Sequence, residues 1–265
     1  MVSKSLMLDN KIKKSLISLA QVAGEKIMAI YEQDFDVSYK KDSSPLTQAD
    51  LASHQYIVGR LRDLTPDIPI LSEETPDYEK LDRMSWETYW LIDPLDGTKE
   101  FVKKNGEFTV NIALVSHQQP IFGVVCAPAL DVTYWGDRAS GAFKVEGGFE
   151  RVITVRSRPA SSANWIVVGS RSHQSDEFKA FMKDYPDAKI ISMGSSLKLC
   201  LVAEGKADLY PRLGLTSEWD TAASQAVVEA AGGQVLALPD MKPLSCNQSM
   251  QSMLNPHFLV CATPL

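Results

Sequence analysis

The chain has 265 residues, of which 45% are hydrophobic and 23% charged, and its formal net charge is −6. These values suit a soluble globular protein of one large or two modest domains, and no apolar run reaches the ~18 residues of a bilayer-spanning helix. The negative charge argues against a general binder of nucleic-acid backbones, so we expect no nucleic-acid partner. An anionic ligand would need local help from a metal ion or from helix N-termini.

The first predicted element is an amphipathic helix over 9–31, because apolar residues recur there at helical spacing and Asp9 or Asn10 can start it. The basic residues of its first turns are Lys11, Lys13 and Lys14. They indicate either a solvated face or a weak peripheral contact with an anionic membrane surface. The N-terminus lacks the uninterrupted apolar core of about 7–15 residues that marks a signal peptide, so we expect a cytoplasmic protein.

A second helix is predicted from Thr47 or Ser44, either of which can cap it, to about Leu64. A strand-like segment, "FDVSYKK", precedes it. Two apolar segments that end in acids, "DIPILSEE" and "YWLIDPLD", then read as buried strands. The strands predicted after them are "FTVNIALVS", "QPIFGVVCAPA", "VTYWGDR", "GAFKVE" and "RVITVRS".

A stretch rich in Ser, Pro and Ala over 157–164 is the best domain boundary and divides the chain into 1–157 and 158–265. After it, strands and helices alternate up to a long helix in "WDTAASQAVVEAAGG", and further strands fill the tail. The pattern predicts an α/β protein with an α+β, antiparallel first half and an alternating α/β second half.

The four cysteines, Cys126, Cys200, Cys246 and Cys261, are widely separated and form no CxxC or Cys/His cluster. We expect buried, reduced thiols rather than a zinc site or disulfides, in agreement with a cytoplasmic protein.

Acidic residues stand at the ends of several apolar elements. They are Glu73 and Glu74, Asp93 and Asp96, and Asp220, with Asp50 on the second predicted helix. Taken singly, each has a plainer explanation: "DPLDG" can be a tight turn, "SEE" a solvated pair, and Asp220 a helix cap. If the ends converge, the carboxylates raise each other's pKa, and a divalent cation such as Mg²⁺ or Mn²⁺ relieves the repulsion.

The spacing of "DPLDGT" suits such a site. Pro94 biases Asp93 toward an extended backbone and leaves the Leu95 carbonyl free to act as a ligand. Gly97 permits close approach of a ligand, and a helix that opens at Thr98 would offer backbone amides to an anion. A metal beside a helix N-terminus is what a phosphoryl group needs.

Three segments together resemble the inositol monophosphatase superfamily over essentially the whole chain: "SEE" (72–74), "WLIDPLDGTKEF" (90–101) and "EWDTAASQAVVEAAGG" (218–233). Within it, "DPLDGTKEF", "GSSLKLCLVAEGKADLYPR" and "TSEWDTAA" are most similar to the branch of bacterial 3′(2′),5′-bisphosphate nucleotidases. Ser72 stands where inositol monophosphatases usually have glycine, which also favours that branch. The resemblance implies a layered αβαβα sandwich with the active site between the two halves.

The resemblance also implies roles for the acids. Glu73, Asp93 and the Leu95 carbonyl would hold one Mg²⁺, and Asp93, Asp96 and Asp220 a second. Glu73 would also contact a third, weaker ion or its water, so two or three ions are expected. Asp50 and Thr98 would orient the attacking water, and Glu74 would support the ligands from behind.

Substrate contacts are implied at Gly97, Thr98, His173, Ser195, Lys198, Arg212 and Asp220. His173 would lie near the nucleoside, Ser195 and Lys198 near the second phosphate and the base, and Arg212 near the same phosphate or the ribose. Alternatives stay open from the residues alone: His173 can be a surface histidine or a cap, Ser195 a cap, and Lys198 solvated.

The expected activity is Mg²⁺-dependent removal of the 3′-phosphate from adenosine 3′,5′-bisphosphate to give AMP, with the sulfated analogue as a further candidate substrate. The resemblance implies a role in sulfur assimilation and inhibition by lithium. The alternatives are a phosphatase acting on inositol monophosphate or fructose 1,6-bisphosphate, and a non-catalytic metal or nucleotide sensor. The complete acid set argues against the sensor, and the sequence leaves monomer or homodimer open.

Overall fold

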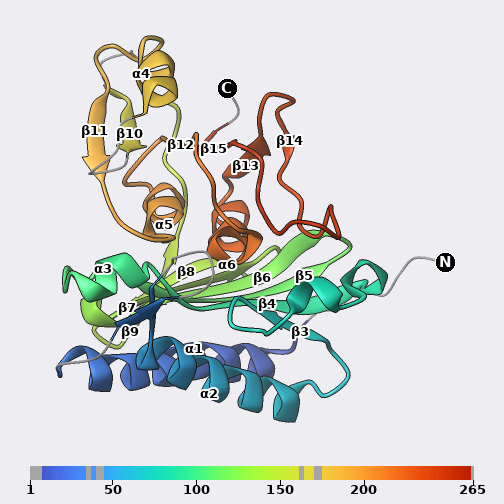
Figure 1. Cartoon of the computed structure of the whole chain (residues 1–265). Coiled ribbons are helices and arrows are strands. Elements are labelled where there is room, and N and C mark those ends of the chain that lie inside the picture. The colour runs from blue at the N-terminus through green and yellow to red at the C-terminus, as the bar shows by residue number, and fades with distance from the viewer. Residues whose placement is uncertain (1–7, 34–36, 40–44, 161–163, 170–174, 264–265) are drawn as a thin grey trace.

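The computed structural model describes residues 8–33, 37–39, 45–160, 164–169 and 175–263, and the statements below concern these residues. They form five layers (Figure 1), which confirms the predicted αβαβα sandwich. Helices α1 (Asn10–Tyr31) and α2 (Gln48–Leu64) cover one face of a seven-stranded sheet. Helices α5 (Leu197–Ala203) and α6 (Glu218–Ala230) separate it from a six-stranded sheet, whose outer face carries α4 (Asp176–Met182).

The large sheet has the order β3-β4-β5-β6-β7-β8-β9, with β3 parallel to β4 and the other pairs antiparallel. Its strands are β3 (Ile70–Ser72), β4 (Thr88–Asp96), β5 (Thr109–Ser116), β6 (Gln119–Ala127), β7 (Val132–Asp137), β8 (Gly141–Glu146) and β9 (Phe149–Ile153). A small separate ladder pairs β1 (Val37–Tyr39) with β2 (Pro45–Thr47), and the short α3 (Thr98–Val102) follows β4. Short 3₁₀ turns span Tyr78–Lys80, Arg83–Ser85 and Pro128–Leu130.

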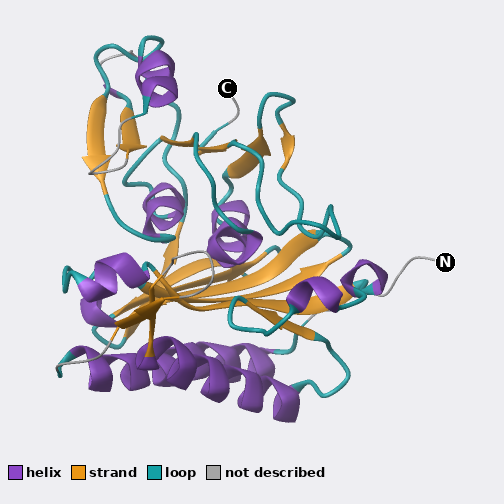
Figure 2. Cartoon of the chain, viewed as in Figure 1, coloured by secondary structure: helices purple, strands orange, loops and turns teal. Residues whose placement is uncertain are grey.

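The second sheet is mixed and has the order β11-β10-β12-β15-β13-β14 (Figure 2). Its strands are β10 (Ile166–Gly169), β11 (Lys189–Ser192), β12 (Leu209–Arg212), β13 (Gln234–Ala237), β14 (Lys242–Pro243) and β15 (Phe258–Cys261). Strand β10 runs parallel to β11 and β12, whereas β15 pairs antiparallel with β12 and β13. The predicted change from an antiparallel to an alternating α/β pattern is therefore confirmed.

Both long N-terminal helices begin at the caps that the sequence predicts. The Asp9 carboxylate accepts a hydrogen bond from the Ile12 amide at 2.7 Å. At α2, Thr47 and Asp50 form a capping box, in which the Thr47 amide donates to the Asp50 carboxylate at 2.7 Å. The cap fixes Asp50 in the first turn of α2, and the second predicted candidate for this cap, Ser44, lies outside the described residues.

The seven-stranded sheet is buried on both faces. Along β5, Ile112 and Leu114 pack toward α1 and α2, whereas Ala113 and Val115 pack into the cluster that contains α5 and α6. This alternation follows from the two-residue period of a strand. It explains why the predicted strands read as almost continuous apolar runs.

Two glycines bring α6 unusually close to the large sheet. A Cβ atom on Gly123 of β6 would lie 2.0 Å from the Ala223 carbonyl oxygen of α6. A Cβ atom on Gly136 of β7 would lie 2.9 Å from the Ala230 Cβ atom. Only glycine allows this approach, which sets the height of α6 above the sheet.

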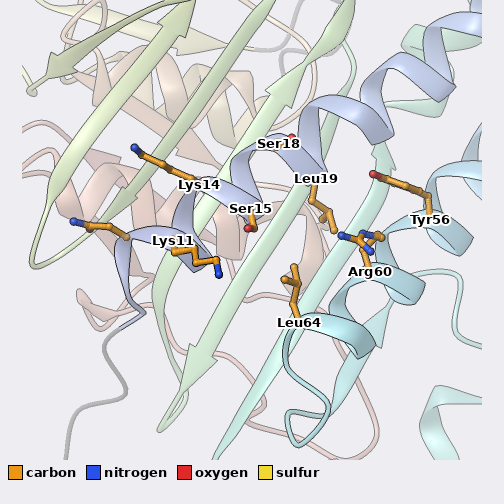
Figure 3. A pocket seen from close by; sticks show the side chains of 9 residues that line it. Lys11, Lys14, Ser15, Ser18, Leu19, Tyr56, Arg60 and Leu64 are labelled. Carbon is orange, nitrogen blue, oxygen red and sulfur yellow. The ribbon is translucent and has the colours of Figure 1, made fainter.

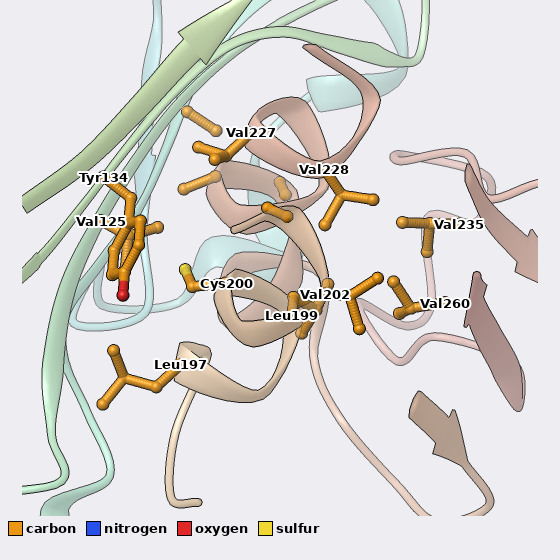
Figure 4. Packing of buried hydrophobic residues seen from close by; sticks show 14 of the residues in the cluster. Val125, Tyr134, Leu197, Leu199, Cys200, Val202, Val227, Val228, Val235 and Val260 are labelled. Carbon is orange, nitrogen blue, oxygen red and sulfur yellow. The ribbon is translucent and has the colours of Figure 1, made fainter. Parts of the chain in front are cut away.

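One hydrophobic cluster joins both halves of the chain (Figure 4). It packs Val125 and Tyr134 of the large sheet against Cys200 and Val202 of α5, and it continues to Val260 of the second sheet. The cluster therefore crosses the boundary predicted at 157–164, and the division into 1–157 and 158–265 stays a prediction.

The four cysteines are buried and form no disulfide with one another, as the sequence predicts. Within the described residues, no helix combines the length and the apolarity that crossing a membrane requires.

Candidate metal and phosphate site

A β-bulge at the end of β4 places two aspartates on the same side of the sheet. Asp93 pairs with Asn111 of β5, and Asp96 pairs with Thr109, so β4 contains one more residue than β5 between these pairs. In a regular strand, residues three apart point to opposite faces, and the extra residue of a bulge reverses this. Pro94 is tolerated inside the strand because a bulge leaves a backbone position without a ladder hydrogen bond.

The bulge brings Asp93 and Asp96 together with Asp220 of α6. One carboxylate oxygen from each residue lies within 4.8 Å of the other two. Asp220 occupies the first turn of α6, where one of its oxygens accepts a hydrogen bond from the Ser217 amide at 2.9 Å. The helix-cap role considered for Asp220 and its place in the acidic cluster are therefore compatible.

Glu73 lies near this cluster, directly after β3. Its backbone amide donates to the Ile92 carbonyl at 3.0 Å, so the residue lies beside Asp93 across the parallel pair β3 and β4. The negative charge of Glu73 raises the pKa of Asp93 and that of Asp220. The acids at the ends of β3, β4 and the start of α6 thus converge.

The cluster is electrostatically unfavourable unless a cation or protons balance it. Burial raises the pKa of Asp93 well above its usual range, and the charges of Glu73, Asp96 and Asp220 raise it further. Burial and then the charge of Asp96 do the same for Asp220, while Arg212 opposes the shift. An all-carboxylate donor set of this kind fits a hard divalent cation such as Mg²⁺.

The predicted pair Asp50 and Thr98 is brought together at the edge of the cluster. The Thr98 hydroxyl lies 3.3 Å from an Asp50 carboxylate oxygen and 3.3 Å from the Leu95 carbonyl oxygen. Thr98 is the first residue of α3, and Gly97 before it has φ = 88°, a left-handed conformation that suits glycine. The backbone therefore turns sharply between the acids and the start of α3.

Ser195, which was expected near the second phosphate and the base, lies against Asp96. The Ser195 hydroxyl donates to the Asp96 carboxylate at 2.5 Å and lies 2.6 Å from the Thr109 hydroxyl. The Ser196 amide donates to the same Asp96 oxygen at 2.6 Å. Ser195 has φ = 55°, so this segment is held in a left-handed turn against Asp96. A contact of Ser195 with the nucleotide stays a prediction.

Two polar residues of β5, which were not predicted from the sequence, support this turn. The Ser196 hydroxyl donates to the Asn111 side-chain oxygen at 2.8 Å and lies 2.8 Å from the Thr109 hydroxyl. Thr109 and Asn111 are buried and two residues apart, on one face of an otherwise apolar strand. The polar pair in the apolar segment "FTVNIALVS" could have indicated these residues, because buried polar side chains need hydrogen-bond partners.

A cleft of about 550 Å³ lies beside the acids and Ser195. The predicted site residues that line it are Asp96, Gly97, Ser195, Lys198, Arg212 and Asp220. The Lys198 ammonium donates to the Ser195 carbonyl at 2.7 Å, and an Arg212 guanidinium nitrogen donates to the Leu215 carbonyl at 2.6 Å. Both cations therefore line the same cleft as the acids, and the charge of Arg212 lowers the pKa of Asp220. The acids form the first wall of this cleft, and the two cations form the second. His173 lies outside the described residues.

A smaller pocket of about 320 Å³ adjoins the cleft and shares Lys198, Tyr210 and Arg212 with it. Phe178 of α4 and Leu213 also line it. An aromatic and apolar depression beside two cations can accept a flat, partly apolar group that carries an anion.

A second depression, of about 600 Å³, lies on the far side of the large sheet between α1 and α2 (Figure 3). Lys11, Lys14 and Arg60 line it, and it shares no residue with the cleft. Lys13 departs from the solvated face expected for it, because its ammonium is buried in an ion pair with Asp137 at 2.8 Å. Among the described residues, no carboxylate lines the depression between α1 and α2, so the cleft is the candidate catalytic site.

Comparisons with known proteins place the chain in one family. Residues 9–251 match the sequence model of the inositol monophosphatase family. The 3′(2′),5′-bisphosphate nucleotidase CysQ of Escherichia coli K12 is 50% identical over 246 residues, which cover 91% of this chain and 96% of that protein. The CysQ of Haemophilus influenzae is 34% identical, with 96% of this chain and 94% of that protein covered.

Solved structures agree with the sequence relatives. CysQ from Bacteroides thetaiotaomicron, described as a bacterial member of the inositol monophosphatase family, is 40% identical and superimposes with a TM-score of 0.83. The match covers 96% of this chain and 98% of that one. An IMPase from Thermotoga maritima is 27% identical, with a TM-score of 0.75 and coverages of 96% and 92%.

Proposed function

Because the chain belongs to the inositol monophosphatase family, we propose that it is a phosphoric monoester hydrolase that acts as a 3′(2′),5′-bisphosphate nucleotidase. It removes the 3′-phosphate of adenosine 3′,5′-bisphosphate and releases AMP and phosphate. The observation that carries the proposal is the carboxylate cluster, which shares one cleft with Lys198 and Arg212. The first wall suits a metal-held phosphoryl group, and the second suits another phosphate.

The residues that would hold the metal are Glu73, Asp93, the Leu95 carbonyl, Asp96 and Asp220. The family is metal-dependent, and we propose Mg²⁺, with two or three ions in each site. When bound, the ions would neutralise charge on the phosphoryl oxygens and lower the pKa of a bound water. The raised pKa values of Asp93 and Asp220 support this assignment, because the cluster needs a counter-charge at neutral pH.

The chain's own residues would position the attacking water. The Thr98 hydroxyl would hold the water in line with the bond to the 3′-oxygen, and the Asp50 carboxylate would accept the proton that passes through Thr98. The contact between Thr98 and Asp50 supports these roles. The amides at the start of α3 would face the phosphoryl oxygens beside Gly97.

Recognition of the nucleotide would come from the second wall. Lys198 and Arg212 would bind the 5′-phosphate, and the adjoining pocket with Phe178 and Tyr210 would accept the base. The sulfated analogue carries the same 3′-phosphate, so we propose it as a further substrate.

In the cell, the enzyme would clear the by-product of sulfate assimilation. The buried, unpaired thiols support a cytoplasmic location. A monomer or a homodimer satisfies the proposal, and Li⁺ is expected to inhibit by occupying a Mg²⁺ position with less charge.

The test measures phosphate release from adenosine 3′,5′-bisphosphate and from inositol 1-phosphate side by side, with Mg²⁺ and then with EDTA. We expect fast release from the nucleotide, slow release from the inositol ester, and loss of both in EDTA. A preference for inositol 1-phosphate would keep the metal site and discard the roles of Lys198 and Arg212. Release from neither substrate would favour a non-catalytic sensor.

A further inference from the structure

Helix α2 touches three different segments of the candidate site through one of its faces. Asp50, Ser53 and His54 stand at positions i, i+3 and i+4, which lie on the same side of a helix. Asp50 contacts the Thr98 hydroxyl at the start of α3. The other two side chains reach the two segments that carry the metal-binding acids.

Ser53 holds the bulge of β4. Its hydroxyl donates to the Pro94 carbonyl oxygen at 2.8 Å, and the side chain is fully buried. Pro94 lies between Asp93 and Leu95, so this bond fixes the peptide that joins two proposed ligands. The bond spans 41 positions of sequence and comes from a rigid helix.

His54 holds the turn that follows β3. Its Nδ1 atom lies 2.9 Å from the hydroxyl of the buried Ser72, and either group can donate. The same Ser72 hydroxyl accepts a hydrogen bond from the Glu74 amide at 3.3 Å, and the Ser72 amide donates to the Thr75 hydroxyl at 3.1 Å. A chain of hydrogen bonds thus runs from α2 through Ser72 to the backbone that carries Glu73.

The half-buried imidazole suits this role. Burial and the charge of Arg62 lower the pKa of His54, so the ring is neutral at physiological pH and keeps one donor and one acceptor nitrogen. A glycine at position 72 would break the chain, because it offers no hydroxyl. Helix α2 does not depend on these bonds for its own packing, since Ile57 and Leu61 are fully buried in the core beneath the sheet.

We propose that His54 and Ser72 are positioning residues. Through them α2, which Ser53 already ties to the bulge of β4, sets the spacing of Glu73 relative to Asp93 and Leu95 and thereby the affinity of the site for its metal ions. The proposal rests on the metal-dependent activity proposed above. It predicts that these residues govern the concentration of Mg²⁺ that the enzyme needs, and leave recognition of the nucleotide unchanged.

The experiment compares full-length wild type with Ser72→Ala, His54→Ala, the double variant and His54→Asn, whose amide can still donate to Ser72. His257→Ala removes an exposed histidine far from α2 and serves as the matched control. Three quantities are measured: the Mg²⁺ concentration for half-maximal hydrolysis, the KM for adenosine 3′,5′-bisphosphate at saturating Mg²⁺, and the rise in Tm caused by Mg²⁺ without substrate.

We expect Ser72→Ala and His54→Ala each to raise the Mg²⁺ requirement about tenfold, because partners that orient metal ligands typically contribute 10–100-fold to metal affinity or activity. The double variant should resemble the single ones, since both break one chain. His54→Asn should recover most of the loss, His257→Ala should match wild type, and the KM should not change.

An unchanged Mg²⁺ requirement in both single variants would overturn the inference, as would a lower kcat or Tm without a shift in that requirement. Failure of the proposed function is a separate result, in which wild type itself releases no phosphate. The Mg²⁺-induced rise in Tm still tests the positioning role in that case, because it needs no substrate.

Discussion

The two walls of the cleft are built in different ways. On the first wall, Asp93 is 1% exposed and its carboxylate accepts a hydrogen bond from the Leu95 amide at 3.0 Å, inside a bulge flanked by paired strands. On the second wall, Lys198 and Arg212 are only partly buried, and each donates to a nearby carbonyl of its own segment.

The difference indicates that the two walls have different functions. The acids are fixed before any ligand arrives, as a catalytic metal site requires. The cations can exchange a carbonyl for a phosphate oxygen when a nucleotide binds, because long basic side chains keep rotamer freedom at a surface. Damage to the first wall should therefore abolish turnover, whereas damage to the second should weaken binding.

The largest expected effect is that of Asp96→Asn. Removal of one charge from the carboxylate cluster should lower kcat about a thousandfold or more, since a preorganised electrostatic contact is worth on the order of 10²–10³ and this residue is also a proposed metal ligand. The fold should persist, because the asparagine oxygen can still accept from Ser195 and Ser196. Wild-type activity in this variant would show that the metal assignment is wrong, and its Tm in EDTA provides the control.

Thr98→Val should have the next largest effect. The substitution keeps the shape of the side chain but removes the hydroxyl that contacts Asp50 and the Leu95 carbonyl. Because the proposed mechanism orients and deprotonates the water through that hydroxyl, kcat should fall by about a hundredfold. The KM and the Mg²⁺ requirement should stay close to wild type, and a change confined to KM would refute the catalytic role.

Arg212→Ala should show that the second wall contributes to substrate binding and not to the chemical step. We expect the KM for adenosine 3′,5′-bisphosphate to rise about 10–100-fold, which corresponds to the loss of a charged hydrogen bond of ~1.5–3 kcal/mol. Hydrolysis of adenosine 3′-monophosphate, which lacks the second phosphate, should not change. Arg138→Ala, which removes an exposed arginine from the surface, is the matched control. Equal losses on both substrates would contradict a contact with the second phosphate.

The smallest expected effect is on the pH dependence of the Tm of the metal-free protein. Asp93 and Asp220 have pKa values well above the ordinary 3.8 in the folded protein, so their protonated forms favour folding. That contribution is complete below the unfolded pKa and is lost as the pH rises through the raised folded values. The Tm of the metal-free protein should therefore fall, relative to the Mg²⁺ form, as the pH rises from the ordinary carboxyl pKa through the raised folded values. A Mg²⁺-induced increase in Tm that is independent of pH would contradict this.

The sequence was most informative where the pattern is local. The helical period and the caps at Asp9 and Thr47 predicted α1 and α2 almost to the residue. The alternation of elements after residue 164 predicted the second sheet and its helices. Acids at the ends of apolar elements, together with the family motifs, identified the residues of the acidic cluster.

What the sequence missed depends on contacts between distant segments. The bulge in β4 is defined by its pairing with β5, so "DPLD" alone left a tight turn as an alternative to a metal site. The bonds from Ser195 and Ser196 to Asp96 span about 100 positions, and no local pattern signals them. Lys13 was expected on a solvated face, but its partner, Asp137, lies on β7.

The most direct test is a crystal structure with Mn²⁺ and AMP, in which anomalous scattering locates the metal. We expect Mn²⁺ peaks bound by Glu73, Asp93, Asp96 and Asp220, and the AMP phosphate beside Lys198 and Arg212. Mn²⁺ bound elsewhere, or an acidic cluster without metal at a saturating concentration, would contradict the account.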